Sequence, residues 1–225
     1  MNHPFKAMNL LFDLDGTLTD PFEGIAKCIL YALQMLGSRL PPGESLGWCI
    51  GPPLKESFAK LLSSDDSALA EKALAFYRRR FGSVGLYENR VYDGIPGALK
   101  ALQENGHRLY VATSKPALYA RQIVDRFDLD SYFINVYGSE LDGTRNDKAH
   151  LISHILQRES IARSETIMIG DREHDMIGAQ ATGVHGFGVL WGYGTKDELR
   201  AAGAQAFIET PTELVSALAQ HRLTS

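Results

Sequence analysis

The sequence predicts an α/β protein: a Rossmann-like, doubly wound parallel sheet forms the core, and an all-helical cap subdomain is inserted into it. Two observations predict this class. Short apolar strand segments alternate with helix segments from about residue 95 onward, whereas residues 20–88 show mainly helix signals. We therefore expect a core made of residues 1–19 and 89–225 and a helical subdomain made of residues 20–88.

Length and composition exclude several other classes. With 225 residues, of which 44% are hydrophobic, the chain has material for one large core with a modest insertion, and it is not disordered. The net charge of −4 argues against a nucleic-acid polymer or an anionic membrane surface as partner. No apolar run reaches the roughly 18 residues of a membrane span, and residues 1–8 do not read as a secretory signal. Because Cys28 and Cys49 are the only cysteines, we expect reduced thiols in a cytoplasmic protein. The sequence does not decide between a monomer and a homodimer.

The first predicted strand is the apolar run at residues 8–12, which ends in Asp-Leu-Asp-Gly-Thr at residues 13–17. A buried strand here would deliver two carboxylates at its carboxyl end. A helix is expected next, because Asp20 can cap it, Pro21 suits its first position and Gly37 can terminate it.

The stretch up to residue 88 predicts the rest of the helical subdomain. Further helices are expected at residues 54–62 and 67–81, and loops rich in proline and glycine separate the helices at residues 41–43 and 51–53.

The alternating part of the chain predicts the remaining core elements. The expected strands are 108–113, 132–137, 166–169, 186–190 and 206–208. The expected helices are 95–105, 116–127, 147–157, 174–181 and two that begin near Thr195 and Thr210. Ligands of such parallel sheets bind beyond the carboxyl ends of the strands.

Residues suited to phosphate chemistry follow the predicted strands at that edge. They are Asp13, Asp15, Thr113, Ser114, Lys148, Asp171 and Asp175. Clustered carboxylates repel one another unless a cation is present, and oxygen ligands suit Mg²⁺. A carboxylate can attack phosphorus, and a second one can transfer the proton. A hydroxyl can hold phosphate oxygens, and a lysine can offset the phosphoryl charge.

Three motifs resemble those of the haloacid dehalogenase superfamily of phosphatases. They are Phe-Asp-Leu-Asp-Gly-Thr-Leu-Thr-Asp at residues 12–20, Val-Ala-Thr-Ser-Lys-Pro at residues 111–116, and Ile-Gly-Asp at residues 169–171 with Asp175. The resemblance extends from Met8 to about His221, and the helical insertion looks like the family's α-helical cap. Residues 143–148, 51–54 and 191–194 are similar to bacterial 5′-nucleotidase-type members related to phosphoglycolate phosphatases.

The resemblance implies a role for each residue of the first motif. Asp13 would be the nucleophile and a metal ligand. Asp15 would be the general acid and base and would offer its backbone carbonyl to the metal. Thr17 would help to orient Asp15 within the substrate site.

The other motifs imply the remaining roles. Thr113 and the Ser114 amide would bind the phosphoryl group, Asp171 would ligate Mg²⁺, and Asp175 would support the site through water. Lys148 would offset the charge of Asp13 and the phosphate, with Lys115 as a rival because the third motif departs from the commoner pattern.

The cap residue Lys55 is a further candidate. It follows the Gly-Pro-Pro-Leu stretch of the insertion and could contact the substrate or lie on the surface.

The resulting hypothesis is a Mg²⁺-dependent phosphomonoester hydrolase that forms an aspartyl-phosphate intermediate. Its favoured substrate is a small soluble nucleoside 5′-monophosphate. A phosphoglycolate phosphatase and a phosphosugar mutase are the alternatives. A dehalogenase is disfavoured, because such enzymes need no acid at the position of Asp15, and a non-catalytic protein is disfavoured, because no motif residue is missing.

Overall fold

The computed structural model describes residues 7–221, so the expectation that no secretory signal precedes the core lies mostly outside the described residues. The chain divides into two compact units. One joins the stretch that ends at Thr19 to the stretch that begins at Val91, and the other is Asp20–Arg90. They are called the core and the helical unit below.

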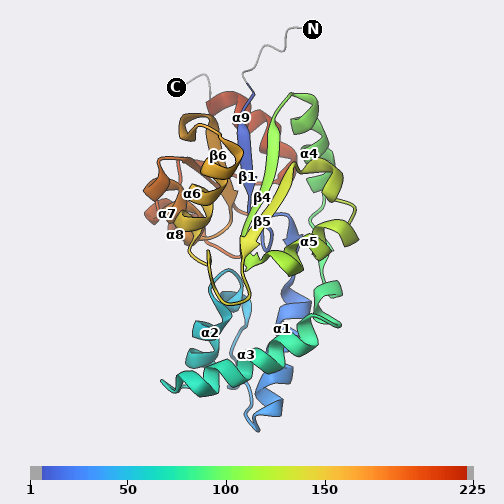
Figure 1. The fold of residues 1–225 in the computed structure, drawn as a ribbon, viewed down its shortest axis with the longest axis vertical. Helices are drawn as coiled ribbons and strands as arrows, with labels where there is room; N and C mark the ends of the chain where they lie inside the picture. Colours follow the sequence, from blue (N-terminus) through green and yellow to red (C-terminus); the bar gives the residue numbers. More distant parts are fainter. Residues whose placement is uncertain (1–6, 222–225) are drawn as a thin grey trace. The chain divides into compact units, whose positions relative to one another are not determined.

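The core contains a six-stranded sheet with the order β5-β4-β1-β6-β7-β8, in which all paired neighbours are parallel (Figure 1). The strands are β1 (Asn9–Phe12), β4 (Arg108–Pro116), β5 (Asn135–Ser139), β6 (Thr166–Gly170), β7 (His185–Val189) and β8 (Ala206–Ile208). Strand β1 is buried throughout, since it lies between β4 and β6. The predicted doubly wound parallel sheet is thereby confirmed.

Helices lie on both sides of this sheet, with α6 and α7 on one side and α4 and α5 on the other (Figure 1). The core helices are α4 (Ile95–Glu104), α5 (Ala117–Arg126), α6 (Lys148–Glu159), α7 (Glu173–Thr182), α8 (Lys196–Ala201) and α9 (Leu214–His221). On the α6 side, Leu151 and Ile155 pack in one buried cluster with Leu11 of β1, Tyr110 of β4 and Met168 of β6. Alternate strand residues thus supply this face, as expected for a sheet covered on both sides.

The helical unit consists of α1 (Phe22–Met35), α2 (Leu54–Leu61) and α3 (Ser67–Phe81) with short 3₁₀ turns. Helix α3 begins after Asp66, whose carboxylate accepts a hydrogen bond from the Ala68 N–H at 2.9 Å. Its buried side includes Tyr77 and Phe81, whose rings stack at 5.3 Å. Gly24 lets α1 approach the turn that follows α3, because a Cβ there would lie 2.7 Å from the Glu88 carbonyl oxygen.

A two-stranded sheet joins the two ends of the insertion. Strand β2 (Thr19–Asp20) pairs with β3 (Arg90–Val91), and the Arg90 guanidinium lies 2.7 Å from the Asp20 carboxylate. The sequence did not predict this pair, because strands of two residues carry no periodic signal.

Two core strands differ from expectation by more than one residue at an end. Strand β4 continues to Pro116, three residues past the predicted end, with a register shift against β5 between Ala112 and Pro116. Strand β5 starts at Asn135, because Tyr132 belongs to a 3₁₀ turn. Within residues 7–221, no helix is both long and apolar enough to cross a membrane.

Candidate active site

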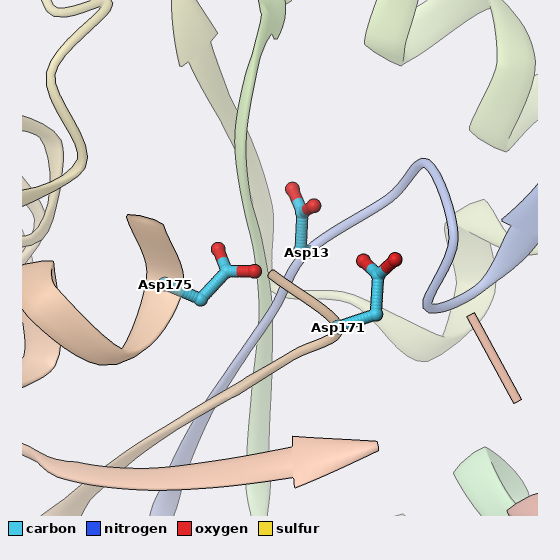
Figure 2. Close-up of side chains that lie close together, drawn as sticks. All are labelled: Asp13, Asp171 and Asp175. Carbon is cyan, nitrogen blue, oxygen red and sulfur yellow. The ribbon is translucent and has the colours of Figure 1, made fainter. Parts of the chain in front are cut away.

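The candidate site lies at the carboxyl edge of the sheet, around the end of β1. Asp13 directly follows β1, and Asp171 directly follows the neighbouring strand β6. The Asp13 N–H donates to the Ile169 carbonyl at 2.9 Å, so the sheet ladder itself fixes the start of the first motif. Asp175 reaches the same place from the first turn of α7 (Figure 2).

Asp13, Asp171 and Asp175 form a buried acidic cluster, because one carboxylate oxygen from each lies within 4.8 Å of the others. Burial and the charges of Asp13 and Asp175 raise the pKa of Asp171 well above its ordinary value. Burial also raises the pKa of Asp175, although the Lys148 charge opposes this. An all-oxygen donor set that is buried and mutually repulsive fits a hard divalent cation such as Mg²⁺.

The sequence predicted Asp13, Asp171 and the Asp15 backbone carbonyl as metal ligands, with Asp175 as a support acting through water. The Asp175 carboxylate belongs to the acidic cluster, and one Asp175 oxygen also accepts the Arg172 N–H at 3.2 Å. The Asp15 carboxylate, which was not assigned to the metal, pairs with Lys115. A contribution from the Asp15 backbone carbonyl stays a prediction.

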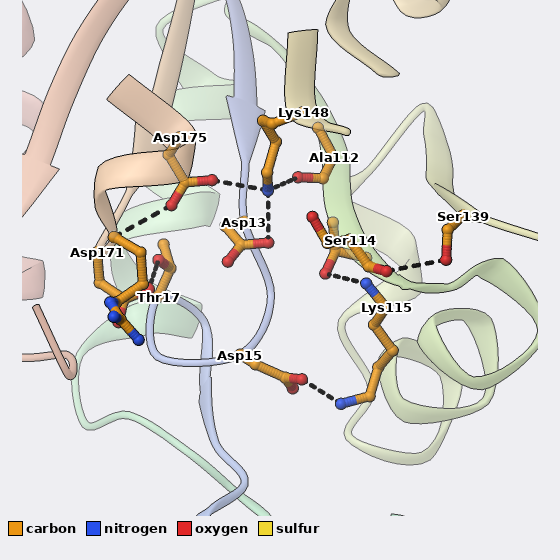
Figure 3. A network of polar contacts seen from close by, with 12 residues as sticks. Asp13, Asp15, Thr17, Ala112, Ser114, Lys115, Ser139, Lys148, Asp171 and Asp175 are labelled. Atoms are coloured by element: carbon orange, nitrogen blue, oxygen red, sulfur yellow. Dashed lines mark hydrogen bonds and ion pairs between the residues drawn. The ribbon is translucent and has the colours of Figure 1, made fainter. Parts of the chain in front are cut away.

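Lys148 lies at the centre of the polar network (Figure 3). It opens α6, a helix capped by Asp147, and its buried ammonium lies 3.0 Å from Asp13, 2.7 Å from Asp175 and 2.9 Å from the Ala112 carbonyl oxygen. Burial alone would lower the pKa of Lys148, but the two facing carboxylates raise it, so the surroundings favour the charged form of this side chain. Of the two rival lysines, Lys148 is therefore the one that pairs with Asp13.

Asp15 and Lys115 form a second buried ion pair beside the first (Figure 3). Lys115 contacts Oδ2 of Asp15, whereas Oδ1 is buried and has no hydrogen-bond partner among the described residues. Burial raises the pKa of Asp15, and the Lys115 charge partly offsets this. The sequence offered Lys115 only as a rival of Lys148, and its contact with Asp15 was not predicted.

Thr113 and Ser114 lie where β4 bends at the edge of the site. The buried Thr113 hydroxyl accepts the Lys115 N–H at 3.2 Å. The Ser114 hydroxyl donates to the Asn146 carbonyl at 3.2 Å, and the Ser114 carbonyl accepts from the Ser139 hydroxyl at 2.8 Å. Their predicted contact with a phosphoryl group stays a prediction.

The Thr17 hydroxyl donates to Oδ1 of Asp171 at 3.2 Å. The hydrogen bonds of the described residues thus link Thr17 to Asp171, whereas the family resemblance implied that it orients Asp15. Lys55 belongs to the helical unit, where its ammonium forms a half-exposed ion pair with Glu71 at 2.7 Å. A contact of Lys55 with substrate stays a prediction.

The loop after β7 supports the site in a way that the sequence did not reveal. The Trp191 indole N–H donates to the Thr17 carbonyl at 3.0 Å, and the Tyr193 N–H donates to Oδ2 of Asp171 at 2.8 Å. Gly192 permits this approach, because a Cβ there would lie 2.5 Å from that same Asp171 oxygen. The alternation of glycines and aromatic residues at 191–194 was the available signal, but it does not name its partners.

Comparison with known proteins identifies relatives along most of the chain. The pattern of the haloacid dehalogenase-like hydrolases matches residues 10–189. A 5′-nucleotidase of Pseudomonas aeruginosa is 52% identical over 193 residues, which are 86% of this chain and 87% of that protein. The tyrosine-protein kinase PtkA of Mycobacterium tuberculosis is 36% identical over 84% of this chain but only 64% of its own length. A phosphoglycolate phosphatase of Nitrosospira multiformis is 30% identical over 86% of this chain and 87% of that protein.

A solved structure gives the same assignment. A crystal structure described as a predicted phosphatase from Clostridium acetobutylicum superimposes with a TM-score of 0.88 at 39% identity, covering 98% of this chain and all of that one. Together with the family pattern across most of the sequence and the relative at 52% identity, this shows that the chain belongs to the haloacid dehalogenase-like hydrolases.

Proposed function

We propose that this haloacid dehalogenase-like phosphatase hydrolyses small phosphomonoesters in a Mg²⁺-dependent reaction, with nucleoside 5′-monophosphates as the favoured substrates. The observation that carries the proposal is the buried Asp13, paired with Lys148 and adjoining Asp171 and Asp175. The favoured substrate class rests on the 52% identity to a 5′-nucleotidase.

The acidic cluster is the place for the metal. Asp13, Asp171 and Asp175 supply carboxylate oxygens from three segments, and Thr17 and the Tyr193 N–H hold Asp171 in place. Mg²⁺ bound there would neutralise carboxylate charge and polarise the phosphoryl group. Lys148 adds a fixed positive charge on the other side of Asp13.

In the first step, a carboxylate oxygen of Asp13 attacks phosphorus. The bond between phosphorus and the ester oxygen breaks, and that oxygen takes a proton from Asp15 to leave as the alcohol. The phosphoryl group is then an acyl phosphate on Asp13, and Asp15 is a carboxylate.

In the second step, Asp15 accepts a proton from a water molecule whose oxygen attacks phosphorus. The bond between phosphorus and Asp13 breaks, inorganic phosphate leaves, and both aspartates regain their first state. The Thr113 hydroxyl and the Ser114 N–H are assigned to the phosphoryl oxygens in both steps.

The test is phosphate release from nucleoside 5′-monophosphates, phosphoglycolate and sugar phosphates, each with Mg²⁺ and with a chelator. Asp13→Asn should reduce kcat at least about a thousandfold while the protein stays folded. Asp197→Asn is the matched control, because that carboxylate lies on the surface with its side chain 91% exposed.

The panel, together with separate assays for a phosphosugar mutase and for transfer from ATP to protein tyrosine, separates the alternatives. Preference for phosphoglycolate would keep the chemistry and replace the substrate. Movement of phosphate within a sugar would indicate the mutase. Transfer from ATP to protein tyrosine would indicate the activity for which PtkA is named. A fully active Asp13→Asn variant would refute the nucleophile.

A further inference from the structure

Lys115 is a buried cation that the reaction as proposed does not use. Its side chain is 7% exposed, and its ammonium pairs with Oδ2 of Asp15. It lies two residues beyond Thr113, on the part of β4 that extends past the predicted strand. A buried ion pair at the residue assigned to proton transfer is a place to look for a functional role.

The end of β4 is shaped so that it directs Lys115 to Asp15. The register shift between Ala112 and Pro116 bends the strand against β5. Gly138 allows this bend, because a Cβ there would lie 2.7 Å from the Ala117 nitrogen and even closer to the Lys115 carbonyl oxygen.

Two hydrogen bonds hold this end of β4 in place, one from the neighbouring strand and one within β4. The Ser139 hydroxyl donates to the Ser114 carbonyl at 2.8 Å, and the Lys115 N–H donates to the Thr113 hydroxyl at 3.2 Å. The position of the Lys115 backbone is therefore set by contacts that do not involve Asp15.

The two oxygens of Asp15 have different surroundings. Oδ2 is held by Lys115, whereas Oδ1 is buried and has no hydrogen-bond partner among the described residues. An unpaired buried oxygen is costly and marks a place where a ligand group completes the hydrogen bonding. The other charges that act on Asp15 are Asp13 and Lys148, and Lys148 contacts Asp13 and Asp175 instead.

We propose that Lys115 is a positioning residue: it holds Asp15 by Oδ2 so that Oδ1 meets the ester oxygen of the substrate. The inference rests on the proposed function, in which Asp15 passes a proton to that oxygen as its bond to phosphorus breaks. In this role Lys115 acts through Asp15 and not on the substrate directly. Without it, the Asp15 carboxyl group rotates among several orientations, and only some of them reach the leaving oxygen.

The experiment compares leaving groups, because only a poor one needs the proton. The wild type and Lys115→Met are assayed on an alkyl phosphate, a nucleoside 5′-monophosphate, and on p-nitrophenyl phosphate, whose leaving group departs without a proton. The value of kcat/KM reports the first step only. Lys115→Met should lower it about a hundredfold for the alkyl phosphate and less than about fivefold for the aryl phosphate.

Three further variants complete the experiment. Lys115→Arg keeps the charge and should restore most of the activity on the alkyl phosphate. Lys115→Gln serves if Lys115→Met does not fold, since its amide can still fill the site. Lys100→Met, an exposed lysine of α4 paired with Glu104, is the matched control and should leave both substrates unaffected.

A double-mutant cycle with Asp15→Asn tests whether Lys115 acts through Asp15. Lys115→Met should cause little further loss once Asp15 is replaced. Equal losses on both substrates, or fully additive losses in the cycle, would overturn the inference while leaving the proposed function intact. A wild type that releases phosphate from neither substrate would overturn the proposed function and the inference with it.

Discussion

Lys148→Met is the substitution with the largest effect on stability that the site predicts. It removes a buried ammonium that lies 3.0 Å from Asp13, 2.7 Å from Asp175 and 2.9 Å from the Ala112 carbonyl oxygen. Methionine has a similar length, so the packing changes little, and the loss is mainly electrostatic. The two carboxylates are left buried without their cation, next to Asp171.

The expected loss of stability follows from leaving these carboxylates buried without a positive partner. Breaking a buried ion pair from one side costs about 3–5 kcal/mol. For a chain of this length, a loss of that size lowers Tm by about 6–20 °C. Because burial already raises the pKa of Asp175, removing Lys148 raises it further, and the variant can relieve the strain by binding a proton.

The sign of the pH dependence follows. A carboxyl group whose pKa is raised in the folded state stabilises the fold at low pH, and this contribution is lost as the pH rises through the folded-state pKa. The deficit of Lys148→Met should therefore be large at about pH 8 and smaller at about pH 5. Excess Mg²⁺ should recover part of it at the higher pH, because the cation replaces some of the missing positive charge.

The assay is urea unfolding in the presence of a chelator, monitored by the fluorescence of Trp191. A Trp48→Phe background removes the other tryptophan signal. Trp191 reports on the core, because its indole N–H bonds to the Thr17 carbonyl. Lys100→Met is the control for the loss of a lysine. A Lys148→Met protein as stable as its parent at the higher pH, or equally destabilised at both pH values, would refute the electrostatic reasoning.

Three further predictions concern other parts of the chain. Gly192→Ala should weaken Mg²⁺ binding and destabilise the core by about 1–3 kcal/mol, because the new methyl group would press on Asp171. Gly97→Ala, with open space around the new methyl group, should be neutral or stabilising. Calorimetric titration measures the Mg²⁺ affinity of each variant, and urea unfolding measures its stability. Mg²⁺ affinity should rise with pH and binding should release protons, because burial and the neighbouring carboxylates raise the pKa of Asp171 in the metal-free protein. Calorimetry in buffers of different ionisation enthalpy measures the protons released, and a release of none would contradict this prediction. Asp66→Ala should destabilise the helical unit by about 1 kcal/mol, because it removes the N-terminal cap of α3. Circular dichroism of the helices during unfolding measures the midpoint, and an unchanged midpoint would contradict the prediction.

The fold was predictable where local periodicity and capping agreed. Helix α3 has the bounds that the sequence predicts, since Asp66 caps it and its apolar positions repeat at helical spacing. Strand β4 was not predicted past Thr113, because its extension depends on Gly138 and Ser139 in another strand. Propensity along one segment holds no information about such a partner.

The candidate site was likewise predictable only in part from the sequence. The order of the motifs along the chain was enough to expect Asp13, Lys148 and Asp171 at one edge of the sheet, and the structure brings them together. The hydrogen bonds of Thr17 to Asp171 and of Lys115 to Asp15 could not be predicted, because they join residues that are 154 and 100 positions apart in the sequence. Only the folded chain decides which of several polar neighbours a hydroxyl or an ammonium meets.

The pairing of β2 with β3 has a consequence for how such a protein changes over evolutionary time. The insertion leaves the core at Thr19 and returns at Val91, and these two points are neighbours in one small sheet. To the core, the whole helical unit is a single long surface loop, and the entropy cost of closing a loop grows only slowly with its length. Lineages could therefore exchange, enlarge or shorten this segment while the acidic cluster at the carboxyl edge of the core sheet stays where it is.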